Sequence, residues 1–235
     1  MNNDVNYWAI VPAAGFGHRL GAPVPKQFLE LGGRTVLEHT LESLWSIAKL
    51  EGLVLVSHGH PALASILERY SDHNLIRAPG GAERCHSVLN GLAALEELAG
   101  DDDWVLVHDA ARPCVRQHDV HLLINRLATH EAGGLLGTPV RDTMKRVDGQ
   151  RRVSATVERT DLWHALTPQM FRYGLLKKAL ETALADGYEV TDEASAMEHA
   201  GYRPQMVEGH ADNIKITRFE DLELASFFLQ LQGRL

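Results

Sequence analysis

Two cations and a run of small residues near the N-terminus have the types and spacing to hold an anion. Residues 9–26 read A-I-V-P-A-A-G-F-G-H-R-L-G-A-P-V-P-K, so Gly15 and Gly17 are followed by Arg19 and Lys26. Glycine lacks a Cβ, which lets backbone N–H groups come close to a ligand's oxygens. Arg19 and Lys26 would add positive charge where a polyphosphate lies. The stretch predicts an anion cradle; the alternative is a Gly-rich surface turn with two solvated cations.

Two well-known phosphate-binding motifs do not fit this stretch. A Walker loop needs Gly-x4-Gly-Lys-Ser/Thr, whereas Lys26 precedes Gln27. A dinucleotide fingerprint needs a third Gly or Ala where this chain has Leu20, and an acid closing the next strand where it has Ser57. A nucleotide ligand is therefore compatible with the sequence, but not as NAD and not through a Walker motif.

Length and composition restrict the class of protein. The chain has 235 residues, 45% of them hydrophobic and 23% charged, which is typical of a globular protein of one large or two small domains. The 23 Lys+Arg against 31 Asp+Glu give a net charge of −8, so no basic footprint for nucleic acid is present. The N-terminus has no signal-peptide pattern, and no apolar run reaches the roughly 20 residues of a membrane helix. Two cysteines without metal spacing fit a reducing compartment. We expect a soluble, cytoplasmic protein with no membrane partner.

Strand and helix patterns alternate along the chain. Continuous apolar runs predict buried strands at Tyr7–Val11, Leu53–Val56 and Trp104–Val107. Further strands are predicted at 74–78, 135–140, 162–171, 205–207 and 214–217, and helices at 35–48, 61–70, 84–98, 117–130, 173–186, 191–199 and from 219 onward. The pattern predicts an α/β fold, with a Rossmann-like, mostly parallel twisted sheet flanked by helices, in a single domain over residues 1–235.

Three loops should meet at one edge of this sheet. Ligands in open α/β sheets bind beyond the carboxyl ends of the strands. The loops that begin at Ala13, Gly80 and Asp109 each follow a predicted strand. We therefore expect them to line one site.

A hairpin interrupts the alternation. Met144–Val147 and Arg152–Val157 flank Asp148-Gly149, a strong hairpin turn signal. An isolated hairpin is marginally stable in water and needs a partner surface. We interpret residues 141–160 as a β-arm that packs on a second subunit of a homodimer.

Seven short segments along the chain form a joint pattern. They are P-A-A-G-F-G-H-R at 12–19 with P-K-Q at 25–27, G-G-A-E-R-C-H-S-V at 80–88, V-H-D-A-A-R-P at 107–113, P-V-R-D-T-M-K at 139–145, W-H-A-L-T-P-Q at 163–169, T-D-E-A-S-A at 191–196 and A-D-N-I-K at 211–215. Together, in order and over nearly the whole chain, they resemble the 2-C-methyl-D-erythritol 4-phosphate cytidylyltransferases of the non-mevalonate isoprenoid pathway.

The resemblance implies a nucleotidyl transfer. The phosphate of methylerythritol phosphate would attack the α-phosphorus of CTP, with Mg2+ as cofactor, to give 4-diphosphocytidyl-2-C-methyl-D-erythritol and pyrophosphate. A phosphate monoester has a second pKa of about 6, so it arrives ionised and needs no activating base. The protein would supply alignment and charge stabilisation.

The resemblance also implies roles for single residues. At the nucleotide, Arg19 and Lys26 match the transition-state-stabilising pair, and the triphosphate loop is matched by Ala13, Ala14, Gly15 and Gly17. The cytosine-recognising stretch is matched by Gly81, Arg84 and Ser87, with the Ser87 hydroxyl and the nearby backbone reading the base edge. Those at the metal are Asp109 and Asp212, and those at methylerythritol phosphate are Arg112, Thr143, Arg159, Thr167 and Lys215. Arg159 and Lys215 would take part in catalysis, and Thr143, Arg159 and Thr167 would serve the partner's site across the dimer.

Two positions depart from the pattern of some relatives. Ala82 replaces an acid, which affects base or ribose affinity if the acid's side chain is used and changes nothing if only its backbone is. His18 replaces a second arginine beside Arg19, which would weaken triphosphate binding slightly.

Other functions remain open on the sequence. A cytidylyltransferase acting on ribitol 5-phosphate would share the nucleotide half of the site and differ around 159–169. A catalytically silent nucleotide-binding regulator would be expected to lack Arg19, Lys26 or Asp109, and all three are present. An oxidoreductase with a degenerate dinucleotide loop is disfavoured by Leu20. The 13 histidines offer no third ligand at zinc spacing, so we interpret them as solvated surface residues.

Overall fold

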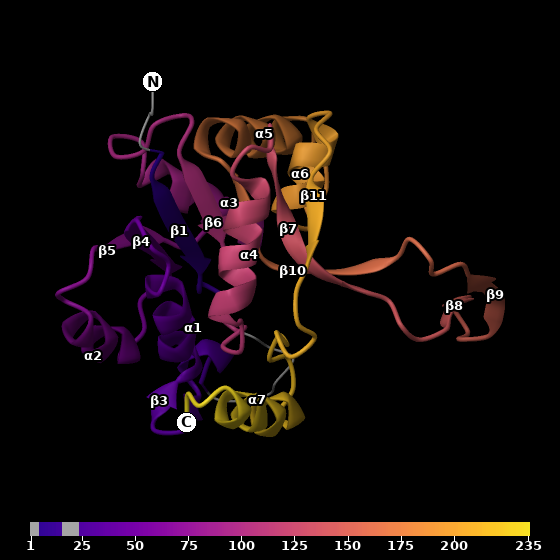
Figure 1. Ribbon diagram of the computed structural model, residues 1–235, viewed down its shortest axis with the longest axis horizontal. Coiled ribbons are helices and arrows are strands. Elements are labelled where there is room, and N and C mark those ends of the chain that lie inside the picture. Colours follow the sequence, from indigo (N-terminus) through magenta and orange to yellow (C-terminus); the bar gives the residue numbers. More distant parts are fainter. Residues whose placement is uncertain (1–4, 16–23) are drawn as a thin grey trace.

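A seven-stranded sheet forms the centre of the molecule. The computed structural model describes residues 5–15 and 24–235 (Figure 1). The strand order is β11 (Gln205–Glu208), β7 (Gly133–Pro139), β10 (Trp163–Arg172), β6 (Trp104–Val107), β1 (Tyr7–Pro12), β4 (Leu50–Ser57) and β5 (Leu75–Pro79). Six of these strands are parallel, and β10 runs antiparallel to both of its neighbours, β6 and β7. The predicted α/β fold with a mostly parallel sheet is confirmed.

Successive residues of the central strands enter different halves of the core. Ala9 and Val11 belong to one buried cluster, whereas Ile10 between them belongs to the other. β4 and β6 alternate in the same way, as the two-residue period of a strand requires. Strands buried on both faces read as continuous apolar runs, which is why their positions were visible in the sequence.

Helices cover both faces of the sheet. On one face pack α1 (Val36–Trp45), α2 (Ala62–Arg69) and α4 (Gln117–Leu127), and on the other α3 (Arg84–Ala93), α5 (Tyr173–Ala185) and α6 (Glu193–His199). α1 begins at a capping box in which the Glu38 backbone N–H donates to the Thr35 hydroxyl at 3.2 Å and the Thr35 N–H donates to Glu38 Oε2 at 2.6 Å. α3 ends at Ala93, short of the predicted Leu98, whose side chain is exposed in the turn that follows.

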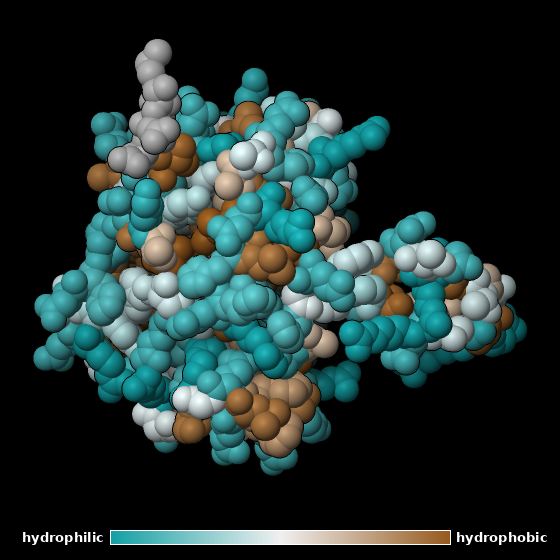
Figure 2. Space-filling view, in the orientation of Figure 1, coloured by the Kyte–Doolittle hydropathy of each residue, from teal (hydrophilic) through white to brown (hydrophobic). Residues whose placement is uncertain are grey.

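The predicted hairpin is present as β8 (Met144–Val147) and β9 (Val153–Val157). It stands out from the rest of the molecule on two long connections (Figure 1). The Asp148 carboxylate closes its turn by accepting the backbone N–H groups of Gln150 and Arg152. Val147 and Val153 are among its exposed apolar residues, and apolar surface is visible on the arm in Figure 2.

A third, smaller cluster packs the C-terminal segment against the start of α1 and the loop after β6. The helix α7 (Glu220–Leu231) packs through Ala225 and Leu229 against a layer containing Val36 and Ile216. Short elements that the sequence did not indicate lie nearby: η2 (Lys26–Phe28), β2 (Glu30–Leu31) and β3 (Arg34–Thr35). In the described parts of the chain, no helix has both the length and the apolar character needed to cross a membrane.

The predicted strand at 214–217 is wrong. This segment forms no ladder with another strand. The Ile216 N–H donates to the Ala111 carbonyl at 2.9 Å, and the Ile216 carbonyl accepts from Lys26 Nζ at 2.9 Å. Its short apolar run is therefore held by a loop and a side chain instead of a neighbouring strand.

Candidate active site

The three predicted loops line a cavity of about 610 Å³ beyond the carboxyl ends of β1, β5 and β6. The lining residues include Ala13, Ala14 and Gly15 of the first loop, Gly80 to Arg84 and Ser87 of the second, Asp109 to Ala111 of the third, and Lys26 and Lys215. The expected convergence is thus observed. Gly17 and Arg19 lie outside the described residues.

Close packing fixes the first two loops against each other. A Cβ built on Gly80 would lie 2.5 Å from the Cβ of Ala14, so only glycine fits there without a shift. Gly15 has open space around it, with no such contact within 4 Å. Hydrogen bonds from a buried side chain also hold the first loop. Gln27 donates through Nε2 to the carbonyls of Ala13, at 2.7 Å, and Gly15, at 3.1 Å. Gln27 belongs to the P-K-Q segment, but no role was predicted for its side chain.

Ser87 bonds within its own loop. Its hydroxyl donates to the Glu83 carbonyl at 3.1 Å and accepts the Gly81 N–H at 3.0 Å. Only 3% of the residue is exposed, although it contributes to the cavity wall. The side chain thereby fixes the turn that leads into α3.

A chain of ion pairs crosses the cavity wall. Arg84 donates from Nε to Asp109 Oδ1 at 2.9 Å, and from both terminal nitrogens to Glu193 at 2.6 and 3.0 Å. The other Asp109 oxygen faces Lys215 Nζ at 2.7 Å and Arg112 Nε at 3.7 Å. Two carboxylates and three cations are therefore concentrated where the loop after β6 meets α3 and α6.

Asp109 is ionised in this environment. Burial acts to raise its pKa, but the charges of Arg84, Lys215 and Arg112 outweigh burial and hold the pKa well below its ordinary range. For Arg84, burial opposes the charged form, and Glu193 and Asp109 together raise its pKa above the usual value. The wall thus presents an ionised carboxylate beside a charged guanidinium.

Arg112 and Thr167 lie behind the wall and do not line the cavity. Arg112 donates to the Asn213 carbonyl at 2.7 Å. The Thr167 hydroxyl accepts the Asp109 N–H at 3.1 Å and lies 2.9 Å from His108 Nδ1. His108 is fully buried, and burial lowers its pKa to about 4, so it is neutral and can accept from Thr167 while donating from Nε2 to the Arg112 carbonyl at 3.1 Å. These contacts hold the backbone on which Asp109 stands.

The two predicted metal ligands are not brought together at the cavity. Asp109 lines it, whereas Asp212 does not. Asp212 Oδ2 accepts from Arg116 at 2.6 and 2.8 Å and from Gln232 at 3.2 Å. Its Oδ1 is a buried oxygen with no hydrogen-bond partner. An ionised carboxylate oxygen suits Mg2+, so Asp109 fits that ion as a single protein ligand, while Asp212 serves Arg116 in this arrangement.

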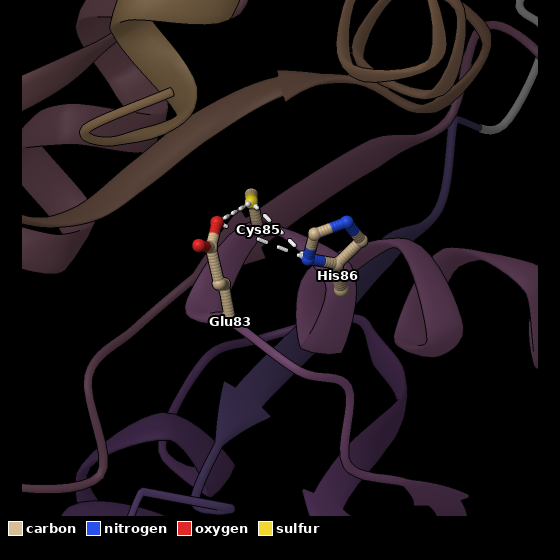
Figure 3. A group of neighbouring side chains, drawn as sticks. All are labelled: Glu83, Cys85 and His86. Carbon is tan, nitrogen blue, oxygen red and sulfur yellow. Dashed lines mark hydrogen bonds and ion pairs between the residues drawn. The ribbon is translucent and has the colours of Figure 1, made fainter. Parts of the chain in front are cut away.

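One other group has ligand atoms close enough for a metal, counting only residues that the structure describes. Glu83, Cys85 and His86 place an oxygen, a sulfur and a nitrogen within 4.8 Å of one another at the start of α3 (Figure 3). The Cys85 thiol lies 3.7 Å from Glu83 Oε2 and 3.8 Å from His86 Nδ1. Burial raises the pKa of this thiol, which disfavours the thiolate that binds metals. We assign no metal to the group.

The arm residues lie apart from this chain's cavity. Thr143 and Arg159 are exposed and do not line it. Arg159 donates to the Arg141 carbonyl, within the connection between the arm and the sheet. Of the residues predicted to hold methylerythritol phosphate, only Lys215 lines the cavity.

The interpretation of the histidines as solvated surface residues is wrong for His39 and His108, which are buried. His58 is exposed and lines the cavity beside Gly80. Glu193 is a functional candidate that was not predicted from the sequence. Its segment belongs to the joint pattern, but no role was predicted for this side chain. A signal was available: Glu193 is an acid in the first turn of a predicted helix, directly before the small and apolar residues A-S-A-M.

The chain is similar to known proteins along nearly its whole length. The family model described as 2-C-methyl-D-erythritol 4-phosphate cytidylyltransferase matches residues 7–231. A relative of that name from Aeromonas hydrophila is 53% identical over 225 residues, covering 96% of this chain and 90% of its own. One from Vibrio vulnificus is 50% identical over 221 residues, covering 94% and 93%.

Solved structures agree. A crystal structure of 4-diphosphocytidyl-2C-methyl-D-erythritol synthase has a TM-score of 0.83 and 37% identity, and the match covers 96% of this chain and 98% of that one. The Francisella tularensis 2-C-methyl-D-erythritol 4-phosphate cytidylyltransferase has a TM-score of 0.79 and 34% identity, covering 95% and 100%. On the matched sequence, the shared fold and the cavity at the sheet edge, the chain belongs to the 2-C-methyl-D-erythritol 4-phosphate cytidylyltransferase family.

Proposed function

We propose that the chain is an enzyme that joins CTP and 2-C-methyl-D-erythritol 4-phosphate, giving 4-diphosphocytidyl-2-C-methyl-D-erythritol and pyrophosphate in the isoprenoid pathway. The observation that carries this function is the cavity itself. Lys26, Arg84 and Lys215 line it together with the small residues of the loop after β1, in a chain whose relatives bear this activity in their names. Cations around a small-residue loop are suited to a triphosphate.

The transfer needs positioning and charge. An oxygen of the ionised acceptor phosphate bonds to the α-phosphorus of CTP, and the bond from that phosphorus to the bridging oxygen breaks, so pyrophosphate leaves with the electron pair. Lys26 Nζ is anchored on the Ile216 carbonyl at 2.9 Å, and Lys215 lies on the adjoining segment of the chain. We assign both to stabilising charge on the transferring and leaving phosphates, with Arg19 as a further cation.

At the nucleotide, the loop from Gly81 to Ser87 recognises the cytosine, and Ala13, Ala14, Gly15 and Gly17 face the triphosphate. Because the Ser87 hydroxyl is used within the loop, we assign Ser87 to shaping the turn instead of reading the base edge. Arg84 is the cation of this loop that lines the cavity, next to the acidic Glu83.

Magnesium would bind at Asp109. The carboxylate would have to exchange contacts with Arg84 or Lys215 for the ion, which would take its other ligands from phosphate oxygens and water. When bound, Mg2+ supplies positive charge to the phosphates. Asp212 does not line the cavity, and Oδ1 is the oxygen that it could offer to the ion while Oδ2 stays on Arg116.

The acceptor half of the site requires a second copy of the chain. Thr143 and Arg159 are exposed on and beside the arm, away from this chain's cavity, so we assign them to the partner's site in a homodimer. Thr167 supports the site by accepting the backbone N–H of Asp109, and Arg112 supports it by placing its charge 3.7 Å from the Asp109 carboxylate. We further propose that residues 1–235 act as one catalytic domain, with residues 141–160 as its arm, and that the enzyme works in the cytoplasm, where it needs neither nucleic acid nor membrane.

The test is pyrophosphate release from CTP and Mg2+, with methylerythritol phosphate and ribitol 5-phosphate as parallel acceptors and a control without acceptor. We expect release only with methylerythritol phosphate. Release only with ribitol 5-phosphate would overturn the acceptor assignment and keep the nucleotide chemistry. Release with neither would overturn the proposed reaction.

A further inference from the structure

The carboxylate of Glu193 is fully buried and takes no part in the proposed reaction. Its exposed fraction is 0%, and it does not line the cavity. Removing a charge from water is costly unless the charge is paired, so a carboxylate in this position needs a reason. Among the described residues, its charged partner is the guanidinium of Arg84, which binds both carboxylate oxygens at 2.6 and 3.0 Å.

We propose that Glu193 is a positioning residue for the nucleotide: it holds Arg84 in the one orientation in which that side chain both faces the cavity and bonds to Asp109. This inference rests on the proposed function. All three guanidinium nitrogens of Arg84 are used, Nε toward Asp109 at 2.9 Å and the two terminal nitrogens toward Glu193. The planar fork geometry of arginine then leaves no freedom of rotation.

Glu193 is itself held in place by the sheet. It is the first residue of α6, where the helix dipole favours an acid. Gln169 of β10 accepts the Ala194 N–H at 2.8 Å and donates to Asp192 Oδ2 at 2.9 Å. β10 therefore fixes the start of α6, α6 fixes Glu193, and Glu193 fixes Arg84.

Loss of the carboxylate has a definite consequence. Without Glu193 the terminal nitrogens of Arg84 are left without acceptors, and the guanidinium can turn to bind Asp109 through two nitrogens or to bind the nucleotide's phosphates. Either movement places the nucleotide wrongly and competes with Lys215 for Asp109. Arg84 belongs to the nucleotide half of the site, so CTP binding should be affected more than turnover.

The experiment compares Glu193→Gln with Glu198→Gln. Both changes remove one negative charge from α6, but Glu198 is exposed. We expect Glu193→Gln to raise the KM for CTP by about tenfold to a hundredfold, with a smaller fall in kcat and an unchanged KM for the acceptor, and Glu198→Gln to behave as wild type. A Glu193→Gln enzyme whose CTP KM equals that of Glu198→Gln would overturn the proposal.

A double-mutant cycle separates positioning from general damage. If Glu193 acts through Arg84, Glu193→Gln should change the CTP KM by less than about twofold in an Arg84→Gln background. Equal effects in both backgrounds would overturn the proposal. If Glu193→Gln does not fold, Glu193→Asp gives the same test, since it keeps the charge and shortens the reach: a raised CTP KM supports the proposal and an unchanged one contradicts it. An inactive wild type would instead overturn the proposed function, and this inference with it.

Discussion

The cavity wall and the arm hold their polar side chains in opposite ways. At the wall, Arg84, Asp109 and Lys215 are linked by ion pairs of 2.6 to 3.0 Å that end on a fully buried carboxylate. On the arm and beside it, Thr143 and Arg159 are exposed, and the arm projects from the body (Figure 1). In the proposed enzyme, one chain preorganises the nucleotide half of the site, and the acceptor half needs a second chain. Preorganisation matters most where charge develops, which is on the nucleotide phosphates.

The largest effect should come from the cavity side. Lys26→Ala should lower kcat by about two to three orders of magnitude, with a smaller change in CTP binding, because its charge is needed most in the transition state. Steady-state pyrophosphate release and equilibrium CTP binding would measure the two effects. Lys49→Ala is the control, since Lys49 is an exposed lysine away from the cavity. Near-normal turnover in Lys26→Ala would remove this residue from the mechanism.

Mixing subunits tests whether the two halves come from different chains. Lys26→Ala and Arg159→Ala subunits, each nearly inactive alone at low acceptor concentration, should regain about a quarter of wild-type activity after mixing, because half of the randomly paired dimers have one intact site. The assay is pyrophosphate release before and after subunit exchange. A mixture that stays as inactive as its components would place both halves in one chain.

The arm alone should give a narrower effect. Arg159→Ala should raise the KM for methylerythritol phosphate by about tenfold and leave the KM for CTP unchanged, because one charge-assisted contact to a phosphate is lost. Initial rates with each substrate varied in turn would show this. Arg152→Ala, which removes an exposed arginine paired with Asp148 at the tip of the arm, is the matched control. If Arg159→Ala changed only the KM for CTP, the assignment of the nucleotide to the cavity wall and of the acceptor to the arm would be wrong.

The smallest effect concerns the stability of the wall. His108 is buried and neutral with a pKa of about 4, below the ordinary value of 6.5, so the unfolded chain binds a proton between these values that the folded chain does not. The contribution of His108 to the free energy of unfolding should therefore be constant above about pH 6.5. It should fall by up to about 3 kcal/mol as the pH is lowered toward 4. Urea unfolding of wild type and His108→Gln across this range would measure it. If the free energy of unfolding changes with pH equally in the two proteins, His108 is not the buried neutral group described here.

The sequence predicted the sheet and the position of the cavity because both follow from local patterns. Apolar runs revealed the buried strands, and the loops after them had to meet at the carboxyl edge. The hairpin was visible from Asp148-Gly149. The segment at 214–217 was predicted wrongly because its bonds go to Ala111 and Lys26, which no local pattern specifies.

The site was predicted less completely because its contacts are long-range. Glu193 meets Arg84 across 109 positions of the chain, and Asp212 meets Arg116 across 96. A list of acids and cations does not say which carboxylate faces which cation. Thr167 and Ser87 were read as ligand contacts, whereas their hydroxyls bond to Asp109 and to the Gly81–Glu83 turn.

The side chains of strand β10 limit where this chain can change in length. Trp163 begins it beside the arm, Thr167 holds the Asp109 backbone, and Gln169 holds the start of α6. A slip of one residue would turn these side chains to the opposite face of the sheet. Insertions in the exposed turn at 148–152 should therefore leave the activity intact, whereas insertions within β10 should abolish it. We therefore expect the tip of the arm to accept changes in length that the strand at its base does not accept.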